Sequence, residues 1–167
     1  MKSSMLKLSL GLLVICLTGC GASDEPQVAV GNYAPAFSLE ARDGTTIESD
    51  SLKGEIVILN FWATYCQPCR HEIPELNQVA ESTRAKVVGI ALDQGGAEVI
   101  KAFERDANLK LNYTVLLGDE EIFQRFDGIG IPYTLVLDRS QRIVKIYRGM
   151  VNRQLLEKDL LTIDSKT

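Results

Sequence analysis

A nearly continuous apolar segment, residues 55–62, is followed after three further residues by the first of two neighbouring cysteines, Cys66 and Cys69. An apolar run of this length predicts a strand that is covered on both faces of a sheet. Pro68 stands in what would be the first turn of a helix, which we expect to begin at the first cysteine or one residue later and to end near Thr83. The sequence thus predicts a cysteine pair where a central strand passes into a helix, and this arrangement constrains the fold most strongly.

Segments of strand and helix type alternate along the remainder of the chain. Asp43-Gly44 lies between two short β-type segments and predicts a hairpin near the start of the domain. A β-α-β pattern followed by β-β-α predicts an α/β fold, in which a mixed central sheet has helices on both faces. We expect strands over residues 37–39, 45–47, 86–92, 113–117, 134–138 and 143–148, and helices over residues 99–107 and 120–126 and from Asn152 onward.

Length and charge exclude some classes of protein. The chain has 167 residues, 46% of them apolar and 24% charged, as expected for one globular domain and a targeting segment. Lys and Arg number 18 against 22 Asp and Glu, which gives a net charge of −4, and the basic residues are scattered singly. Because a nucleic-acid-binding protein carries a basic stripe or patch, this distribution argues against nucleic acid as a partner.

The N-terminus has the organisation of an export signal. Lys2 and Lys7 precede a brief apolar run that ends in Leu17-Thr18-Gly19-Cys20. The run is too short for an ordinary transmembrane helix and predicts a signal peptide. Its end resembles the bacterial lipobox, in which the cysteine takes a lipid and cleavage occurs just before it. We therefore expect a lipoprotein signal peptide over residues 1–19, a lipidated Cys20 and tether over 20–30, and one domain over 31–167; an uncleaved signal anchor with an incidental Cys20 is the alternative.

This organisation assigns each cysteine a place. Cys16 would leave with the signal peptide and Cys20 would be capped by lipid, so that Cys66 and Cys69 remain as free thiols. The domain would then be anchored to a membrane of the bacterial cell envelope and face the oxidising extracytoplasmic side. The choice between inner and outer membrane stays open. A disulfide between Cys66 and Cys69 closes a loop too small to stabilise a fold much, so the role of the pair must lie in chemistry.

The spacing of the pair suits thiol–disulfide exchange. Unpaired N–H groups and the positive end of the helix dipole favour a thiolate at the helix start, where Cys66 is expected. Cys69, one turn further on, is placed to resolve a mixed disulfide. Structural zinc is the alternative, but it normally takes four ligands, and the sequence offers no second C-x-x-C motif and a single histidine, His71. We expect no cofactor other than the redox-active disulfide.

A wider set of residues resembles one protein family. The set comprises residues 61–70, Ala34 to Phe37, Asp43-Gly44, Leu52 to Gly54, Glu72 and Pro74. It is similar to the TlpA/ResA branch of the thioredoxin-like proteins, which are membrane-tethered thioredoxins that include the reductants of cytochrome c maturation. The similarity runs from about Gly31 to the C-terminus. It implies a thioredoxin-like fold with an N-terminal β-hairpin, in which residues 97–117 form an added helix and strand.

The resemblance also implies a role for an acidic residue. Thioredoxin has a buried Asp at the position of Asn60, so its usual proton acceptor is missing from this chain. The TlpA/ResA branch carries a Glu three residues after the second cysteine, and Glu72 stands there. One helical turn separates Glu72 from Cys69, so its carboxylate would exchange a proton with the resolving thiol. A solvated carboxylate in an early helical turn is the alternative.

Four further residues are expected around a bound substrate. In thioredoxin-like folds the site of Ile131-Pro132 holds a cis proline that faces the disulfide, and the residue before the proline pairs through its backbone with the substrate chain. Because X–Pro bonds are mostly trans, this expectation comes from the resemblance. Trp62 and Tyr65 are expected to flank the sulfurs, with ordinary packing as the alternative; the family usually has Trp where this chain has Tyr65.

Together these features predict an extracytoplasmic thiol–disulfide oxidoreductase. Gln67-Pro68 is closer to the Gly-Pro of thioredoxin than to the dipeptides of strong oxidants, which favours reduction of disulfides in exported proteins, with electrons from a membrane thiol donor. One alternative is a peroxiredoxin, which needs a Thr three residues before its reactive cysteine; here Ala63 holds that position and Thr64 is out of register. A second alternative is a disulfide-bonded binding lipoprotein without turnover.

Overall fold

The computed structural model describes residues 27–164, in which a five-stranded mixed sheet forms the centre. The strand order is β5-β4-β3-β6-β7; β3 is parallel to β4, β4 is parallel to β5, and the other two pairs are antiparallel. Every residue of the middle strand is buried, as its continuous apolar sequence predicts. The strands are β3 (Val57–Trp62), β4 (Lys86–Ala91), β5 (Thr114–Leu117), β6 (Tyr133–Leu137) and β7 (Ile143–Arg148).

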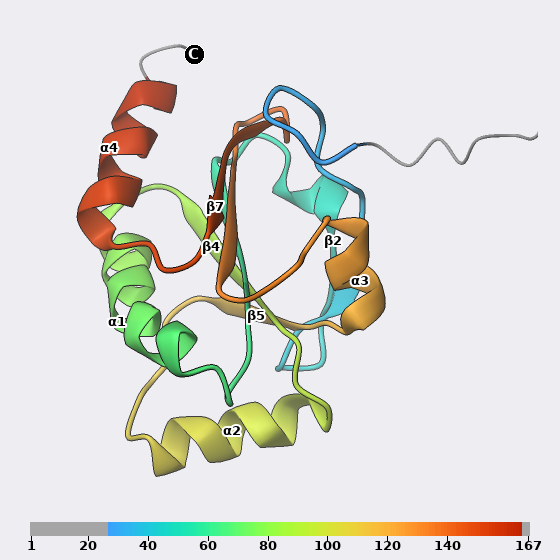
Figure 1. The fold of residues 1–167 in the computed structure, drawn as a ribbon, viewed down its shortest axis with the longest axis vertical. Coiled ribbons are helices and arrows are strands. Elements are labelled where there is room, and N and C mark those ends of the chain that lie inside the picture. The colour runs from blue at the N-terminus through green and yellow to red at the C-terminus, as the bar shows by residue number, and fades with distance from the viewer. Residues whose placement is uncertain (1–26, 165–167) are drawn as a thin grey trace, which may run out of the picture.

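Helices cover both sides of this sheet (Figure 1). Two long helices, α1 and α4, lie on one side, and α2 packs against the same core through Ile100 and Phe103. The short helix α3 and a two-stranded hairpin lie on the other side. The elements are β1 (Ser38–Glu40), β2 (Thr46–Glu48), the 3-10 helix η1 (Ser49–Leu52), α1 (Gln67–Ser82), α2 (Gly96–Asp106), α3 (Glu120–Arg125) and α4 (Arg153–Asp164).

The predicted α/β architecture is confirmed, including the N-terminal hairpin and the added helix and strand. The added elements are α2 and β5, and β5 forms an edge of the sheet. The side chain of Asn152 caps α4, because its Oδ1 accepts a hydrogen bond from the N–H of Leu155 at 2.9 Å. The sequence did not predict η1. The expected signal peptide and Cys20 lie outside the described residues.

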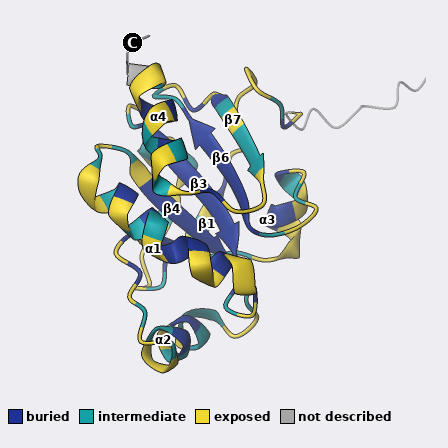
Figure 2. Cartoon of the chain, turned by 60° about the vertical axis from the view of Figure 1, so that its left-hand side comes forward, coloured by how far each residue is buried: buried dark blue, intermediate teal, exposed yellow. Residues whose placement is uncertain are grey.

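The strands β3 and β6 are buried along their whole length (Figure 2). Alternation of side chains along the strands divides the core into two faces. Phe61 of β3 points toward α3 and packs there with Phe123, Phe126 and Tyr133; we call this side the aromatic face. Ile58 and Trp62 of the same strand point toward α1 and α4, together with both cysteines, and we call this side the cysteine face. Within residues 27–164, no helix is both long and apolar enough to cross a bilayer.

Candidate active site

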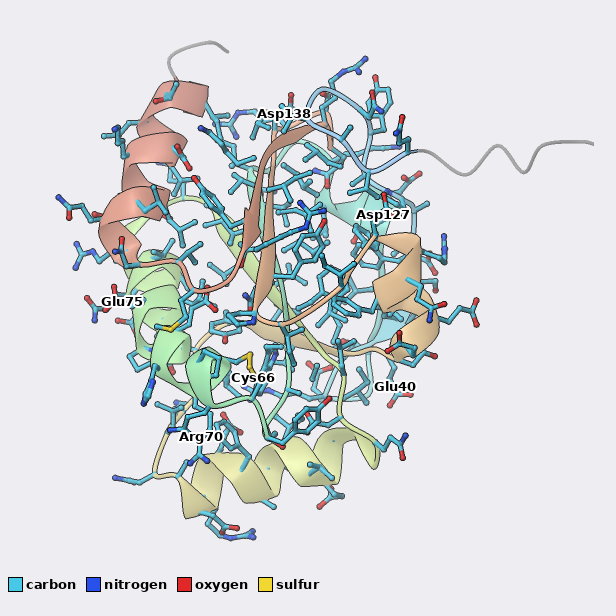
Figure 3. All side chains as sticks on the ribbon, viewed as in Figure 1. Glu40, Cys66, Arg70, Glu75, Asp127 and Asp138 are labelled. Carbon is cyan, nitrogen blue, oxygen red and sulfur yellow. A yellow bond between two sulfur atoms is a disulfide. The ribbon has the colours of Figure 1, made fainter. Side chains whose placement is uncertain are left out.

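Cys66 and Cys69 form a disulfide at the N-terminal end of α1 (Figure 3). Cys66 is the N-cap residue of the helix, and its Sγ accepts a hydrogen bond from the N–H of Cys69 at 3.2 Å. The residue Cys66 is 7% exposed, whereas Cys69 is 1% exposed. An incoming thiol or disulfide therefore reaches Cys66 more easily than Cys69, which is the order that the sequence predicts for attacking and resolving sulfurs.

The connection from β3 to the helix is held by two sets of hydrogen bonds. The N–H of Cys66 donates to the carbonyl of Ala63 at 3.1 Å, which forms a tight turn before the helix. The N–H of Thr64 donates to Asp93 Oδ2 at 3.0 Å, and the Thr64 hydroxyl donates to Oδ1 of the same carboxylate. The Thr64 hydroxyl is thus engaged by Asp93, and this contact helps to hold the connection between β3 and α1.

Glu72 lies inside the protein, one turn after Cys69 on α1. It is fully buried, which contradicts the alternative of a solvated surface carboxylate. Its Oε1 accepts a hydrogen bond from the N–H of Val151 at 3.1 Å. Burial raises the pKa of Glu72 from its ordinary value of 4.5 to about 7, although the Val151 N–H and the Asn60 side chain act to lower it. A carboxyl group with this pKa can both accept and donate a proton near neutral pH.

Asn60 occupies the position on β3 beside this carboxyl group. It is buried, and its Nδ2 donates to Thr134 Oγ1 at 2.9 Å across the β3–β6 pair. An amide at this position stays neutral at every pH, so it does not exchange protons with the cysteines. Glu72 is therefore the ionisable side chain that the fold buries beside the resolving cysteine, as the sequence comparison with thioredoxin implied.

The peptide bond between Ile131 and Pro132 is cis, as predicted. Tyr133, the first residue of β6, pairs with Phe61 near the C-terminal end of β3. Pro132, which directly precedes β6, therefore lies near the end of β3 that leads to the cysteines. The Pro132 carbonyl accepts a hydrogen bond from the N–H of Gly149 at 2.9 Å. Ile131 is partly buried and packs against both core clusters, one of which contains the two cysteines. The cis proline and the disulfide thus belong to the same end of the sheet.

The two predicted aromatic neighbours differ in their surroundings. Trp62 is fully buried on the cysteine face and packs against Phe103, with ring centroids 5.7 Å apart. This is the ordinary packing that was the alternative to substrate contact, and it leaves no indole surface for a client in this conformation. Tyr65 is 74% exposed and directly precedes Cys66. Ile129 and Met150 are exposed as well, in the loops that flank Pro132 and Val151.

His71 and the acidic residues form no metal centre in the part of the chain that the structure describes. Among residues 27–164, no group of three or more His, Cys, Asp or Glu side chains could hold a metal ion. His71 is exposed and its Nε2 lies 3.4 Å from Gln67 Nε2.

Sequence reasoning missed two partners of the site. The Val151 amide, which contacts Glu72, is a backbone group, and backbone donors carry no residue-type signal in a sequence. Thr134 follows Pro132-Tyr133 and was assigned only to a strand, because the sequence does not reveal its pairing with Asn60. The alternation of side chains on β3 and β6 would have placed both residues on the same face, once the pairing register was known.

The chain is similar to known proteins in sequence and in fold. The sequence profile of the AhpC/TSA family matches residues 30–166. The thiol-disulfide oxidoreductase ResA of Bacillus cereus is 31% identical over 143 residues, which make up 84% of this chain and 82% of that protein.

Two solved structures from Chlorobium tepidum are similar in fold. One, a thiol:disulfide interchange protein of the thioredoxin family, is 30% identical and has a TM-score of 0.66, with 85% of this chain and 99% of that chain covered. The other, the thiol:disulfide interchange protein DsbE, is 24% identical and has a TM-score of 0.73, with 82% and 99% covered. The chain belongs to the AhpC/TSA family and, within it, to the TlpA/ResA-like thioredoxins, which are thiol–disulfide oxidoreductases.

Proposed function

We propose that this oxidoreductase reduces disulfides of exported proteins, with Cys66 as the attacking thiolate, Cys69 as the resolving thiol and Glu72 as their proton exchanger. The observation that carries the proposal is the buried Glu72 carboxyl group, one helical turn from Cys69 and with a pKa of about 7. A purely structural disulfide has no use for such a group, whereas a thiol that must lose its proton before each attack does.

The exchange proceeds in two steps from the reduced domain. The Cys66 thiolate attacks one sulfur of a client disulfide, the client S–S bond breaks, and the other client sulfur leaves as a thiolate that takes up a proton. Cys69 then gives its proton to Glu72 and attacks Cys66 Sγ. The mixed disulfide breaks, the Cys66–Cys69 disulfide forms, and the second client sulfur leaves as a thiolate that takes the proton held by Glu72. Two electrons pass to the client in each cycle, together with one proton from Cys69 by way of Glu72 and one proton from the solvent.

The surface around Cys66 supports binding of a polypeptide client. The backbone of Ile131, beside the cis Pro132, is the element that would pair with an extended client segment. Tyr65, Ile129 and Met150 supply exposed apolar side chains in neighbouring segments, and apolar side chains of this kind favour contact with an unfolded or extended chain. Trp62 supports this surface from below through its packing on Phe103.

The residues around the pair favour one direction of electron flow. Strong disulfide oxidants are oxidants because their reduced form is stabilised. Gln67 and Pro68, the residues between the cysteines, carry no positive charge that would stabilise the Cys66 thiolate. The guanidinium of Arg70 lies over the Phe103 ring, 5.5 Å from its centroid. We infer that the domain is a reductant, and that a thiol donor in the membrane reduces the Cys66–Cys69 disulfide after each cycle.

We place the domain on the extracytoplasmic side of the cell envelope, held by lipid on Cys20. The support is the charged, apolar and small-residue order of the first 20 residues. In the native host, Cys20→Ala should give a soluble or unprocessed form, whereas Cys16→Ala, inside the signal peptide, should leave membrane association unchanged. Normal processing and membrane association of Cys20→Ala would exclude lipidation at this residue.

The catalytic roles are tested by trapping mixed disulfides. Cys69→Ser removes the resolving thiol, so clients should stay linked to Cys66 and be identified by mass spectrometry after thiol blocking in the native host. Cys66→Ser is the matched control and should trap no clients by this route. Equal trapping by both variants would contradict the assignment.

The alternatives are separated with the purified, reduced domain. We expect it to reduce a disulfide-bonded peptide rapidly and to consume hydrogen peroxide no faster than a small dithiol. Rapid peroxide consumption that depends on Cys66 would favour the peroxidase. A Cys66–Cys69 disulfide that small thiols fail to reduce would favour the binding lipoprotein.

A further inference from the structure

The Glu72 carboxyl group is only half satisfied by its hydrogen bond to Val151. Among the residues that the structure describes, three buried side-chain atoms have no hydrogen-bond partner: Glu72 Oε2, Trp62 Nε1 and Tyr113 Oη. Their chemistry is complementary, because an ionised carboxylate oxygen accepts, an indole N–H donates, and a phenol hydroxyl does both. Buried polar groups are rarely left unpaired, so this coincidence needs a physical explanation.

The sheet brings the two aromatic side chains together over a glycine. Gly89 on β4 pairs with Asn60 on β3 and with Val115 on β5, so it lies beside Asn60 on the cysteine face. A Cβ atom at Gly89 would lie 2.9 Å from Tyr113 Cε2 and 3.0 Å from Trp62 Nε1. The indole nitrogen and the hydroxyl-bearing half of the Tyr113 ring therefore approach the same point, which any larger residue at position 89 would occupy.

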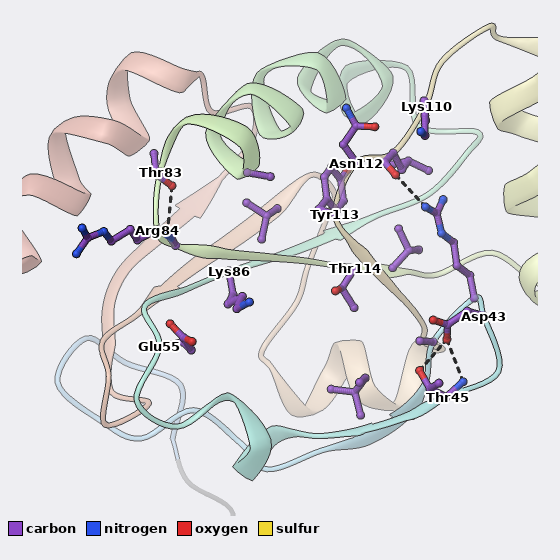
Figure 4. A pocket seen from close by; sticks show the side chains of 18 residues that line it. Asp43, Thr45, Glu55, Thr83, Arg84, Lys86, Lys110, Asn112, Tyr113 and Thr114 are labelled. Atoms are coloured by element: carbon purple, nitrogen blue, oxygen red, sulfur yellow. Dashed lines mark hydrogen bonds between the residues drawn. The ribbon is translucent and has the colours of Figure 1, made fainter.

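Tyr113 also lies within electrostatic reach of Glu72. Burial raises the pKa of Tyr113 well above its ordinary value, and the negative charges of Glu72 and Glu104 raise it further, while Arg42 opposes the shift. The Tyr113 hydroxyl thus keeps its proton throughout the physiological range and remains a donor. On its outer side, Tyr113 forms part of the wall of a pocket of about 960 Å³ (Figure 4).

We propose that Tyr113 is a positioning residue for Glu72: the Tyr113 hydroxyl and the Trp62 indole N–H hold Glu72 Oε2 through one shared internal water molecule. The water accepts from the two donors and donates to the carboxylate oxygen, which gives it the three hydrogen bonds that are typical of a buried water. The cluster completes the coordination of the carboxylate, whose other oxygen is held by Val151. Its importance for turnover rests on the proposed exchange of a proton between Glu72 and Cys69.

Other ionisable groups around Glu72 have to be separated from this effect. On α1 these are Cys66 and Cys69, which do not titrate in the disulfide form. Beyond Tyr113 lies the ion pair of Arg42 with Glu104, at 2.8 Å. On α1 itself, Glu75 accepts a hydrogen bond from the N–H of Arg153, the first residue of α4. Tyr147 of β7 donates a hydrogen bond to Asp159 of α4, which also lies 3.7 Å from Lys145.

The oxidised protein offers a direct test. The chain contains a single tryptophan, so its indole N–H gives one side-chain signal of this kind in a ¹H–¹⁵N spectrum. We expect this signal to titrate with a midpoint near the Glu72 pKa of about 7, and to lose that titration in Glu72→Gln. Tyr113→Phe keeps the ring and removes the hydroxyl; because the carboxylate loses a donor, the midpoint should rise by about one pH unit.

A matched control and a kinetic readout complete the test. Tyr133→Phe removes a buried hydroxyl on the aromatic face and should leave the midpoint unchanged. In stopped-flow measurements of mixed-disulfide resolution, Tyr113→Phe should move the pH profile in the same direction, and should have no further effect in a Glu72→Gln background.

The outcomes distinguish the cluster from the proposed function. The cluster would be overturned if the indole signal had the same titration midpoint in wild type and in Tyr113→Phe. It would also be overturned if the titration of this signal were unchanged in Glu72→Gln. Shifted midpoints would establish the cluster even if Glu72→Gln resolved mixed disulfides at the wild-type rate, and that rate would refute only the proton-exchange role of Glu72.

Discussion

The two faces of the central sheet treat buried polar groups differently. On the aromatic face, Phe61 packs against Phe123, Phe126 and Tyr133 with ring centroids between 5.2 and 5.9 Å apart. The Tyr133 hydroxyl on this face donates to the Phe126 carbonyl at 3.0 Å. On the cysteine face, the Tyr113 hydroxyl has no partner among the described residues, and a carboxyl group is buried with one oxygen unpartnered. The aromatic face thus pairs its buried hydroxyl group, whereas the cysteine face buries polar atoms without partners at the place where we propose proton exchange.

The two faces should also contribute differently to the free energy of folding. A buried polar group without a hydrogen bond costs about 1–3 kcal/mol, and a buried carboxylate costs more. Aromatic packing gains free energy through buried area and through ring contacts worth about 0.5–1.5 kcal/mol each. We infer that packing on the aromatic face stabilises the fold and offsets the cost of the unpartnered polar groups on the cysteine face. Substitutions on the two faces should therefore separate stability from activity.

The largest loss of stability is expected on the aromatic face. Phe126 is fully buried and contacts the rings of Phe61 and Phe37. Phe126→Ala should lower the free energy of unfolding by about 3–5 kcal/mol, because it leaves a cavity in a closely packed core. Urea denaturation of the oxidised protein measures the loss. The alkylation rate of Cys66 in the reduced, folded variant should match wild type, and a large change in that rate would show that the faces are not separable.

A pH-dependent loss of similar size is expected from the cysteine face. The pKa of Glu72 is about 7 in the folded protein against an ordinary value of 4.5, so the folded state binds more protons between these two pH values. Stability should therefore fall as pH rises through this window, by about 3 kcal/mol in total, and the loss should be complete above the folded pKa. The measurement is the difference in unfolding free energy between wild type and Glu72→Gln from pH 4 to 8. A difference that does not change with pH would contradict the raised pKa.

The sequence predicted those features of the two faces that depend on short stretches of neighbouring residues. Continuous apolar residues identified β3, and Pro68 with the cysteine spacing identified the start of α1. The cis bond before Pro132 was expected from the family resemblance, since local sequence does not distinguish cis from trans. Contacts between distant segments could not be predicted in this way.

Two features of the cysteine face illustrate that limit. Val151 and Glu72 are 79 residues apart in the chain, and the contact depends on how the segment after β7 packs against α1. Trp62 and Tyr113 have the sequence pattern of ordinary core residues. Both side chains approach Gly89 because of the way β3, β4 and β5 are paired. A hydrophobic pattern predicts which face of the sheet a side chain lies on, but it does not predict which residue of the neighbouring strand lies opposite.

A smaller steric effect is expected at Gly89. Its φ angle is not in the left-handed region, so alanine is allowed by the backbone, but the added Cβ would meet Tyr113 and Trp62 at 2.9 and 3.0 Å. Gly89→Ala should lower stability by about 1–3 kcal/mol, as overpacking usually does. It should also displace the indole N–H signal of Trp62. Gly128→Ala would disturb the Phe123 side instead, and serves as the control on the aromatic face.

The smallest effects on stability come from two neighbours on β6 that point to opposite faces. Thr134→Val removes the acceptor of the Asn60 amide, and Tyr133→Phe removes the donor to Phe126, so each should cost about 1 kcal/mol in urea denaturation. Their effects on Glu72 should differ. The Asn60 amide already acts on Glu72 and also donates to Thr134; in Thr134→Val it loses the Thr134 acceptor, so its interaction with the Glu72 carboxylate should strengthen and lower the pKa of Glu72 further. The titration midpoint of the Trp62 indole signal should fall in Thr134→Val and stay constant in Tyr133→Phe. An unchanged midpoint in both variants would mean that the Asn60 amide does not reach the carboxylate, and that Val151 alone opposes the effect of burial.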